Sequence, residues 1–286
     1  MSFAAALLAL IGCSGGPPPV AADYCERTVD DFCDYYLRCG RMAVDDVATC
    51  HTVFLERCNA VYEPRYRTLE ERGVLALSAD GLDACAEHLQ TVACDQQIGD
   101  LDGACAQLWT GLTPAGGACA PGVESLVCAE GTTCVLGLDL CGSCEATVAT
   151  GATCGDGLRC QAADSCLDGV CVARGRPGDA CDVVPCALGA RCVDNLCQVP
   201  DIAGLGDTCD AFHPCAYASV CTGGTCNAVA WLGQSCDTTT PCGSGWCDAG
   251  TCAALFDDGV SCERGDQCVS GLCDGTCSAL PGVCFE

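Results

Sequence analysis

The sequence of 286 residues contains no lysine, so its 12 basic residues are all arginine, whereas 38 residues are acidic. The net charge is −26, and the acidic residues are spread along the chain without a long run of one sign. A protein that binds nucleic acid needs a basic surface to displace the counterions of the phosphates. This charge balance argues against a nucleic-acid partner, and it predicts a solvated surface that keeps the chain soluble.

Large apolar side chains are also scarce. Aromatic residues make up 5% of the chain, and the apolar share of 50% includes 35 cysteines and many alanines. Large aliphatic and aromatic side chains together occupy only about a quarter of the positions, a level at which a hydrophobic core is hard to build. The sequence therefore argues against one large enzyme fold. Cross-links must stabilise the chain instead, in small modules arranged in series.

Recognisable catalytic motifs are missing as well. After the first 22 residues the sequence has no G-x-S-x-G, and the chain has no H-E-x-x-H and no phosphate-binding glycine loop. Only three histidines are present, and paired C-x-x-C motifs of the kind that hold zinc are absent. We therefore expect no enzymatic activity, no cofactor and no metal site.

The first residues are uncharged and apolar. The run from Phe3 to Ile11 is too short to cross a bilayer, but it has the length of the apolar region of a signal peptide. Leu10-Ile11-Gly12-Cys13 resembles the bacterial lipobox, in which the cysteine is acylated on sulfur and becomes the new N-terminus. This resemblance implies a signal peptide over residues 1–12, lipidation of Cys13 and a proline-containing tether over residues 13–22.

The residue after Cys13 bears on the destination of the chain. A serine at this place, Ser14, resembles the sorting context of lipoproteins that are sent to an outer membrane. The resemblance implies an exported protein, held by its lipid at the outer membrane or the cell surface. Export places the other 34 cysteines in an oxidising compartment, where as many as 17 disulfides can form and persist.

Residues 23–112 contain eight widely spaced cysteines between helix-like apolar patterns. Two one-sided stripes predict two helices, the first marked by Cys25, Val29, Phe32, Tyr36 and Cys39 and the second by Val47, Cys50, Phe54, Cys58 and Val61. A third helix is expected from Leu82 to Cys94, entered from Ser78 or Asp80. This part of the chain is therefore predicted to be a helical module.

The cysteines of the first two helices suggest a pairing. In an antiparallel helix pair, residues that face each other have nearly constant sums of their residue numbers. Cys33 with Cys58 and Cys39 with Cys50 give sums of 91 and 89, so we expect these two bridges. The other four cysteines, Cys25, Cys85, Cys94 and Cys105, then close the third helix onto this hairpin, with their pairing left open.

From residue 113 to 286 the cysteines come closer together, with glycine, aspartate and proline between them. Five units follow a period of 26 to 28 residues and the pattern Gly-x-x-Cys-x(4–5)-Cys-x(4–5)-Cys-x(3–4)-Cys. The glycine that opens each unit predicts a turn with positive φ, and the last half of each unit predicts a small β-hairpin. We name these units repeat 1 (151–171), repeat 2 (178–197), repeat 3 (206–226), repeat 4 (233–252) and repeat 5 (259–286), after an irregular unit near 116–144.

The expected fold is small and disulfide-rich, with an N-terminal α-helical module stapled by cysteines and an extended array of short β-hairpin repeats. The repeats resemble the cysteine-rich units called Dickkopf N-terminal-like or EGF-like. Together with the lipobox and the helical module, they are similar to the cysteine-rich lipoproteins of myxobacteria. The units lack the calcium-binding EGF consensus, so the resemblance does not imply calcium binding.

The number of cysteines before each junction of the array is odd. If Cys13 is left out, 13 cysteines precede repeat 1, and each of the next repeats adds four. At least one disulfide must therefore cross every junction, unless a thiol is free or bonded to another chain. We expect an array that is laced into a rod.

Three further features of the sequence bear on function. Cys141-Gly142-Ser143-Cys144 has the C-x-x-C spacing of thiol–disulfide oxidoreductases, although the strand–helix setting of those enzymes is not evident. The cysteines could also bind zinc or copper as thiolates. Trp231, Trp246 and Phe256 are large side chains in repeats with almost no core, so they mark either an interaction surface or packing between repeats.

These observations lead to one functional expectation. We expect a lipid-anchored binding or structural protein of a bacterial envelope, attached to the membrane through Cys13. Its rigid, acidic array would present a surface to a protein or glycan partner. The metal-thiolate protein and, after it, the thiol–disulfide oxidoreductase are the alternatives.

Overall fold

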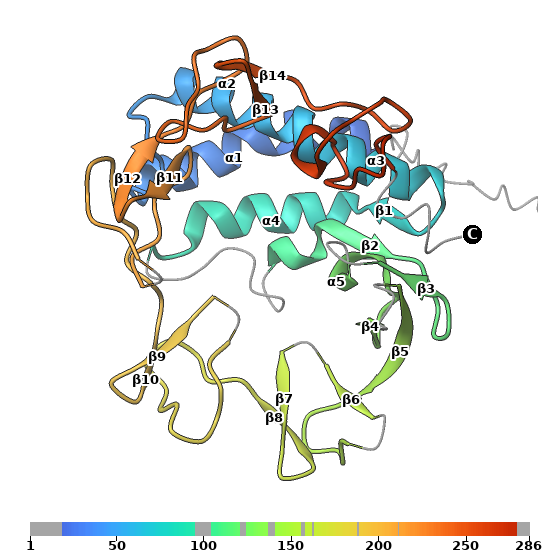
Figure 1. Ribbon diagram of the computed structural model, residues 1–286. Coiled ribbons are helices and arrows are strands. Elements are labelled where there is room, and N and C mark those ends of the chain that lie inside the picture. Colours follow the sequence, from blue (N-terminus) through green and yellow to red (C-terminus); the bar gives the residue numbers. More distant parts are fainter. Residues whose placement is uncertain are drawn as a thin grey trace, which may run out of the picture.

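The computed structural model describes residues 19–94, 104–120, 124–136, 141–155, 158–161, 163–187, 189–210 and 212–278. The helices come first and lie together, and the hairpins then arch away from them and return to them (Figure 1). Within these ranges, no helix combines the length and the apolar character that a membrane crossing requires. The predicted signal peptide, Cys13 and most of the tether lie outside the described residues.

The predicted helices of the N-terminal module are confirmed. Helix α1 (Tyr24–Arg38) is followed by Gly40 with a φ of +60°, a conformation that favours glycine. Helix α2 (Val47–Arg57) begins after Asp46, whose side chain accepts a hydrogen bond of 2.9 Å from the backbone N–H of Thr49. The chain then makes the π-helical turn η2 (Cys58–Tyr62) and continues as α3 (Glu63–Glu71).

The third predicted helix is also present. Helix α4 (Ala79–Thr91) begins at the expected residue, because the Ser78 hydroxyl accepts a hydrogen bond of 2.9 Å from Gly81 N–H. Strand β1 (Leu75–Leu77) precedes it, and β2 (Trp109–Gly111) pairs with β1 after the short 3-10 helix η3 (Ala104–Leu108). This small ladder brings the end of the module back beside its helices.

The expected disulfides of the helical hairpin are wrong in register. Cys33, Cys39, Cys50 and Cys58 are all disulfide-bonded, but the bridges are Cys25–Cys58, Cys33–Cys50 and Cys39–Cys94, with Cys85–Cys105 as the fourth. The residue numbers of both bridges between α1 and α2 add to 83. The constant-sum rule therefore holds. The loop between the helices moves the register by about two turns, so Cys39 faces the end of α4 instead.

The irregular unit forms a small sheet and shares a core with the helices. Its strands are β3 (Ala118–Cys119), β4 (Thr132–Leu136) and β5 (Gly142–Val148), in the order β3–β5–β4, and α5 (Glu124–Val127) lies between β3 and β4 along the chain. The short strand β6 (Arg159–Cys160) runs parallel to β5. Leu69 and Leu75 of the helical module pack in one buried cluster with Val127, Cys119, Cys128 and Cys144 of this unit.

The predicted hairpins are confirmed in repeats 1 to 4. They are β7 (Asp164–Leu167) with β8 (Val170–Ala173), β9 (Arg191–Val193) with β10 (Leu196–Gln198), β11 (Ser219–Thr222) with β12 (Thr225–Ala228), and β13 (Trp246–Asp248) with β14 (Thr251–Ala253). Each two-residue turn has positive φ at both positions, as at Asp168 (49°) and Gly169 (79°), which matches the twist of the strands. The glycines that open the five repeats have φ between 79° and 94°, as expected.

The disulfides of the array follow one pattern. In each repeat the first cysteine bonds to the third and the second to the fourth, as in Cys154–Cys166 and Cys160–Cys171. The irregular unit has the same pattern, with Cys119–Cys134 and Cys128–Cys144. Its fifth cysteine, Cys141, is therefore the residue that makes the upstream count odd.

None of these twelve bridges crosses a junction between units. Cys141 is also disulfide-bonded, and the two cysteines that remain in the sequence, Cys13 and Cys284, lie outside the described residues. A disulfide that crosses the junctions between units, as the odd count requires, therefore stays a prediction. Among the described cysteines, Cys141 is the one that this prediction concerns.

Backbone hydrogen bonds connect consecutive units. The linker before each repeat from 2 to 5 makes an isolated parallel bridge with the second cysteine of that repeat. In the linker before repeat 3, Ala203 N–H donates to Pro214 C=O at 2.9 Å and Ala203 C=O accepts from Ala216 N–H at 2.9 Å. The corresponding linker residues are Gly175, Ala230 and Phe256, and Thr113 bridges Cys128 in the same way. These bonds fix how each unit follows the one before.

The path of the array differs from the expected rod. We call repeats 1 and 2 the arch. Their hairpins β7 to β10 lie apart from the helices, whereas β11 to β14 of repeats 3 and 4 lie against α1 and α2 (Figure 1). Repeat 5, which contains the 3-10 helix η4 (Gly265–Gln267), lies beside α3. The chain thus forms a ring in which the last repeats cover the first helices.

Candidate functional site

Repeat 3 meets the helical module through backbone pairing. Ala43 N–H donates to Tyr217 C=O at 2.9 Å, and Tyr217 N–H donates to Arg41 C=O at 2.8 Å. The loop between α1 and α2 therefore pairs with the repeat as in a parallel sheet. This pairing is the first of three contacts between the repeats and the helical module. The other two, made by repeats 4 and 5, are described below, and we call the three together the return contact.

The side chain of Tyr217 packs into the aromatic cluster of the helices. Its ring centroid lies 5.4 Å from that of Tyr36 and 6.2 Å from that of Phe54, and the guanidinium carbon of Arg57 lies 5.2 Å from the ring centroid. The neighbouring Ala218 is buried in the same core cluster. These contacts place the half-buried ring between a cation and two aromatic side chains, an arrangement that stabilises the return contact.

Repeats 4 and 5 supply the other two points. One carboxylate oxygen of Glu56, on α2, accepts hydrogen bonds from Leu232 N–H at 2.8 Å and from the Ser244 hydroxyl. Arg65, on α3, donates from Nη2 to the carbonyl oxygen of Val269 at 3.4 Å. Three successive segments of the helical module thus bind three successive repeats.

Replacement of Glu56 tests the second point. Ser244 is only 1% exposed, so Glu56→Ala leaves a buried hydroxyl without its acceptor, and we expect a local loss of about 2 kcal/mol. Amide hydrogen exchange over residues 230–245 should accelerate by more than tenfold. Glu56→Gln is the matched control, because its side-chain oxygen can still accept both bonds. Equal exchange in Glu56→Ala and the wild-type protein would contradict this role.

Burial in this cluster shifts the titration of its phenols. Burial raises the pKa of Tyr36 to about 12, with smaller contributions from Tyr35 and Tyr62, and it also raises the pKa of Tyr24, Tyr66 and Tyr217. The folded state therefore favours the neutral phenol over the phenolate.

This shift predicts an alkaline limit of stability. The pKa of Tyr36 in the folded state exceeds the ordinary value of 10.0. The stability that the buried neutral phenol contributes is therefore complete below pH 10 and is lost as the pH rises towards about 12. We expect tyrosinate absorbance and loss of helical circular dichroism to appear together in this range. Phenols that all ionise near their ordinary pKa while the helices persist would show that the cluster is open to water.

The proposed aromatic interaction residues are half-buried and contact this same chain. Trp231, in the linker before repeat 4, packs against the core cluster of α1 and α2. Trp246 and Phe256 form an edge-to-face pair with ring centroids 5.8 Å apart, and the guanidinium carbon of Arg264 lies 6.0 Å from the Trp246 ring. Of the two interpretations, these contacts favour packing between units. A role in binding a partner stays a prediction.

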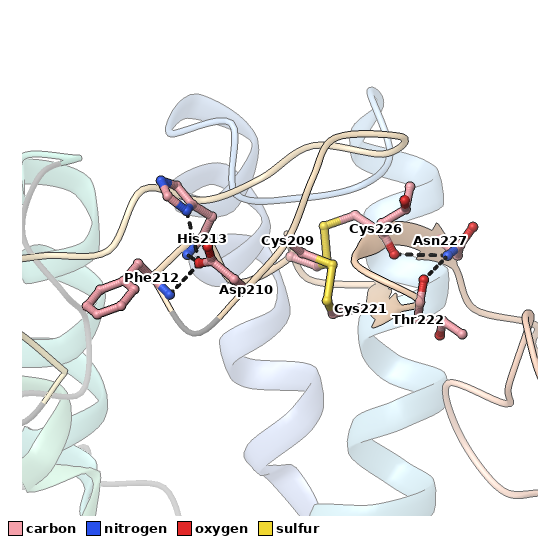
Figure 2. Close-up of a disulfide and its surroundings, with 10 residues drawn as sticks. Cys209, Asp210, Phe212, His213, Cys221, Thr222, Cys226 and Asn227 are labelled. Carbon is pink, nitrogen blue, oxygen red and sulfur yellow. Dashed lines mark hydrogen bonds and ion pairs between the residues drawn. A yellow bond between two sulfur atoms is a disulfide. The ribbon is translucent and has the colours of Figure 1, made fainter.

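Acidic residues of the repeats close turns. Figure 2 shows repeat 3, where Asp210 follows Cys209 and its Oδ1 accepts from Phe212 N–H at 2.7 Å and from His213 N–H at 2.8 Å. These hydrogen bonds lower the pKa of Asp210, and the bond from Phe212 N–H makes the largest contribution. Asp237 does the same in repeat 4 with Thr239 and Thr240. The carboxylates after the first cysteine thus stabilise the loop to the second one.

Sulfur atoms gather in every unit, but as disulfides. In the irregular unit and in repeats 1 to 4, three cysteine sulfurs lie within 4.8 Å of one another. All of them belong to the bridges described above. Zinc and copper bind thiolates, so these clusters could hold a metal only after reduction.

The C-x-x-C segment does not form a redox pair. Cys144 is bonded to Cys128, and Cys141 stands directly before strand β5 instead of at a helix N-terminus. A helix N-terminus is the setting that lowers the thiol pKa in oxidoreductases. The geometry therefore gives no support to a thiol–disulfide oxidoreductase. Turnover of insulin disulfides by the purified protein would be the evidence needed to restore that hypothesis.

Sequence reasoning missed the residues of the return contact. The chain has six tyrosines, five of which precede residue 67, so Tyr217 is the only tyrosine of the array. The position of this single tyrosine, far from the other five in the sequence, was the available signal that Tyr217 contacts the helical module. Glu56 and Ser244 carried no comparable signal, because acidic and small polar residues are common throughout. Comparison of the chain with protein-family models, with curated proteins and with solved structures found no match.

Proposed function

We propose that this protein is an exported, lipid-anchored component of a bacterial envelope, whose disulfide-rigidified ring presents a binding surface to a partner outside the cell. One observation carries the proposal: all 33 cysteines among the described residues are disulfide-bonded. So many bridges form and persist in an oxidising compartment and not in a reducing cytosol.

The anchoring part of the proposal rests on the sequence. The lipobox-like Leu10-Ile11-Gly12-Cys13 supports acylation of Cys13, and the proline-containing tether supports a spacer between the lipid and the first helix. The resemblance to myxobacterial cysteine-rich lipoproteins belongs to this proposal too. A structure made rigid by short covalent loops and covered by acidic groups suits a binding role without catalysis.

Intact mass spectrometry of the protein from its native membrane fraction tests this proposal. We expect a chain that begins at an acylated Cys13 and does not react with a thiol-alkylating reagent before reduction. Reduction should add about two hydrogens for each bridge, in line with 17 bridges for 34 cysteines. A chain that still begins at Met1 and has alkylatable thiols would refute both export and anchoring.

A metal-thiolate protein is the second candidate, because three sulfurs lie within 4.8 Å of one another in five units. It requires reduced cysteines in the native protein. Native protein that contains zinc or copper in stoichiometric amount, and that becomes alkylatable when a chelator is added, would favour this candidate over the first.

A further inference from the structure

A cleft lies between the irregular unit and repeat 1, beside the arch. It has a volume of about 680 Å³ and is lined by strand β4 on one side and by β6 and β7 on the other. These strands are neighbours in the lower part of Figure 1. The volume is in the range of clefts that bind ligands, and none of the contacts between the helices and the last repeats involves these strands.

Strand β4 presents a free edge. Among the described strands it pairs only with β5. Cys144 of β5, directly opposite Cys134, donates its N–H to Gly117 at 2.8 Å and accepts from Gly116 N–H at 2.7 Å, both on the far side from β4. Cys134 and Cys144 are therefore a non-hydrogen-bonded pair, and the backbone N–H and C=O of Cys134 point away from β5. Neither group has a hydrogen-bond partner among the described residues.

Strand β7 has the same property. Cys171 of β8 lies opposite Cys166. Its N–H donates to Ala152 C=O at 2.9 Å, and its C=O accepts from Gly151 N–H at 2.7 Å. The backbone groups of Cys166 therefore point away from β8, again without a partner within the described ranges. Strands β4 and β7 thus both carry backbone donors and acceptors without a partner among the described residues, the arrangement that accepts an added strand.

The cleft also contains two arginines without an acidic partner. Arg159 is exposed, and Arg174 is half-buried with its Nη1 donating to Cys186 C=O at 3.5 Å. Arg174 Nε is buried without a hydrogen-bond partner. The one acidic residue among the described lining residues, Asp164, is 6% exposed and accepts a hydrogen bond of 2.7 Å from Thr150 Oγ1. The ion pairs between described residues include neither arginine.

From these observations we infer that the cleft between β4 and β7 binds an extended peptide segment, which pairs with the free edge of β4 and places a carboxylate against Arg159 and Arg174. Backbone pairing supplies affinity that does not depend on the peptide sequence. The two guanidiniums select a carboxylate through charge-assisted hydrogen bonds. Since β4 has five residues, it can pair with a segment of about five residues.

A peptide fits better than a saccharide. The described residues of the lining include no aromatic ring on which a sugar could stack, whereas both strand edges offer the groups that a peptide backbone pairs with. This inference rests on the binding role proposed above and narrows it to one site and one class of partner.

A library of heptapeptides with free C-terminal carboxylates tests the inference. The library is incubated with purified, oxidised protein, and bound peptides are identified by mass spectrometry. We expect a selected peptide to bind one to one, and amidation of its carboxylate, or N-methylation of its backbone, to weaken binding by about tenfold or more. The bound peptide should slow amide exchange over residues 132–136.

Variants locate the carboxylate. Arg159→Gln and Arg174→Gln should each weaken peptide binding by about tenfold. Arg159 is exposed, so its replacement does not endanger the fold. Arg176→Gln is the matched control, because Arg176 is exposed two residues further on and does not line the cleft, and it should bind the peptide as the wild-type protein does.

Several results would overturn the inference. They are the failure of the library to yield a binder, equal binding by the arginine variants, protection of a segment other than 132–136, and binding of uronate oligosaccharides at these arginines without any peptide. The assay uses oxidised protein in solution. A negative result here therefore leaves export and anchoring, which the mass measurement tests, untouched.

Discussion

Replacing Cys181 and Cys192 together by alanine is expected to unfold repeat 2 while the helices stay folded. The bridge closes a loop with a sequence separation of 11, and loss of such a cross-link costs about 3 kcal/mol. Among the described residues of repeat 2 only Cys197 is buried, so no core remains to oppose the loss. Amide exchange across residues 178–197 should reach the rate of an unfolded chain.

The double replacement of Cys33 and Cys50 is the matched comparison. This bridge has a separation of 17, so its loss costs about the same 3 kcal/mol. Here, however, Val29, Val53 and Phe54 pack around the missing sulfurs. We expect α1 and α2 to remain helical with faster exchange. Full protection of repeat 2 without its bridge would show that the linker hydrogen bonds alone hold the arch.

Replacement of Tyr217 by alanine is expected to open the ring. The change removes the tilted ring contacts with Tyr36 and Phe54 and the cation–π contact with Arg57, at a cost of about 3 kcal/mol. Repeats 3 to 5 should then separate from α1 and α2. Small-angle X-ray scattering should record a larger radius of gyration, and amide exchange at Ala43 and Tyr217 should accelerate.

Tyr217→Phe is the control for this prediction, because phenylalanine keeps the ring contacts and loses only the hydroxyl. It should retain the compact scattering profile. Each repeat of the opened protein should keep its own disulfides and hairpin, since those are local. An unchanged radius of gyration for Tyr217→Ala would mean that Glu56 and Arg65 suffice to hold the repeats in place.

The ring explains why the protein has two kinds of surface. Repeats 3 to 5 contact the helices, and their large side chains, such as Trp231 and Tyr217, serve that contact. The hairpins of the arch lie apart from the helices. The proposed peptide cleft lies where the arch meets the irregular unit, with two free strand edges and two arginines that have no acidic partner among the described residues, in a chain that is otherwise strongly acidic. The free strand edges could not be recognised in the sequence, because an edge depends on which strands happen to be neighbours.

Local features were determined by the sequence alone. The period of the cysteines located five repeats, glycines such as Gly178 marked turns with positive φ, and the spacing of apolar residues located three helices. These features depend on residues within a few positions of one another, where backbone sterics and side-chain periodicity decide the conformation.

Only the tertiary structure decided which residues that are far apart in the sequence come into contact. The loop after α1 set the register that joins Cys25 to Cys58 and Cys33 to Cys50, and Cys39 was thereby free to reach Cys94. The return of the array depends on the direction in which each linker leaves one repeat and enters the next, and small changes of direction accumulate over five repeats. Local pattern does not encode that sum, so contacts such as that of Tyr217 with Tyr36 appear only once the whole chain is folded.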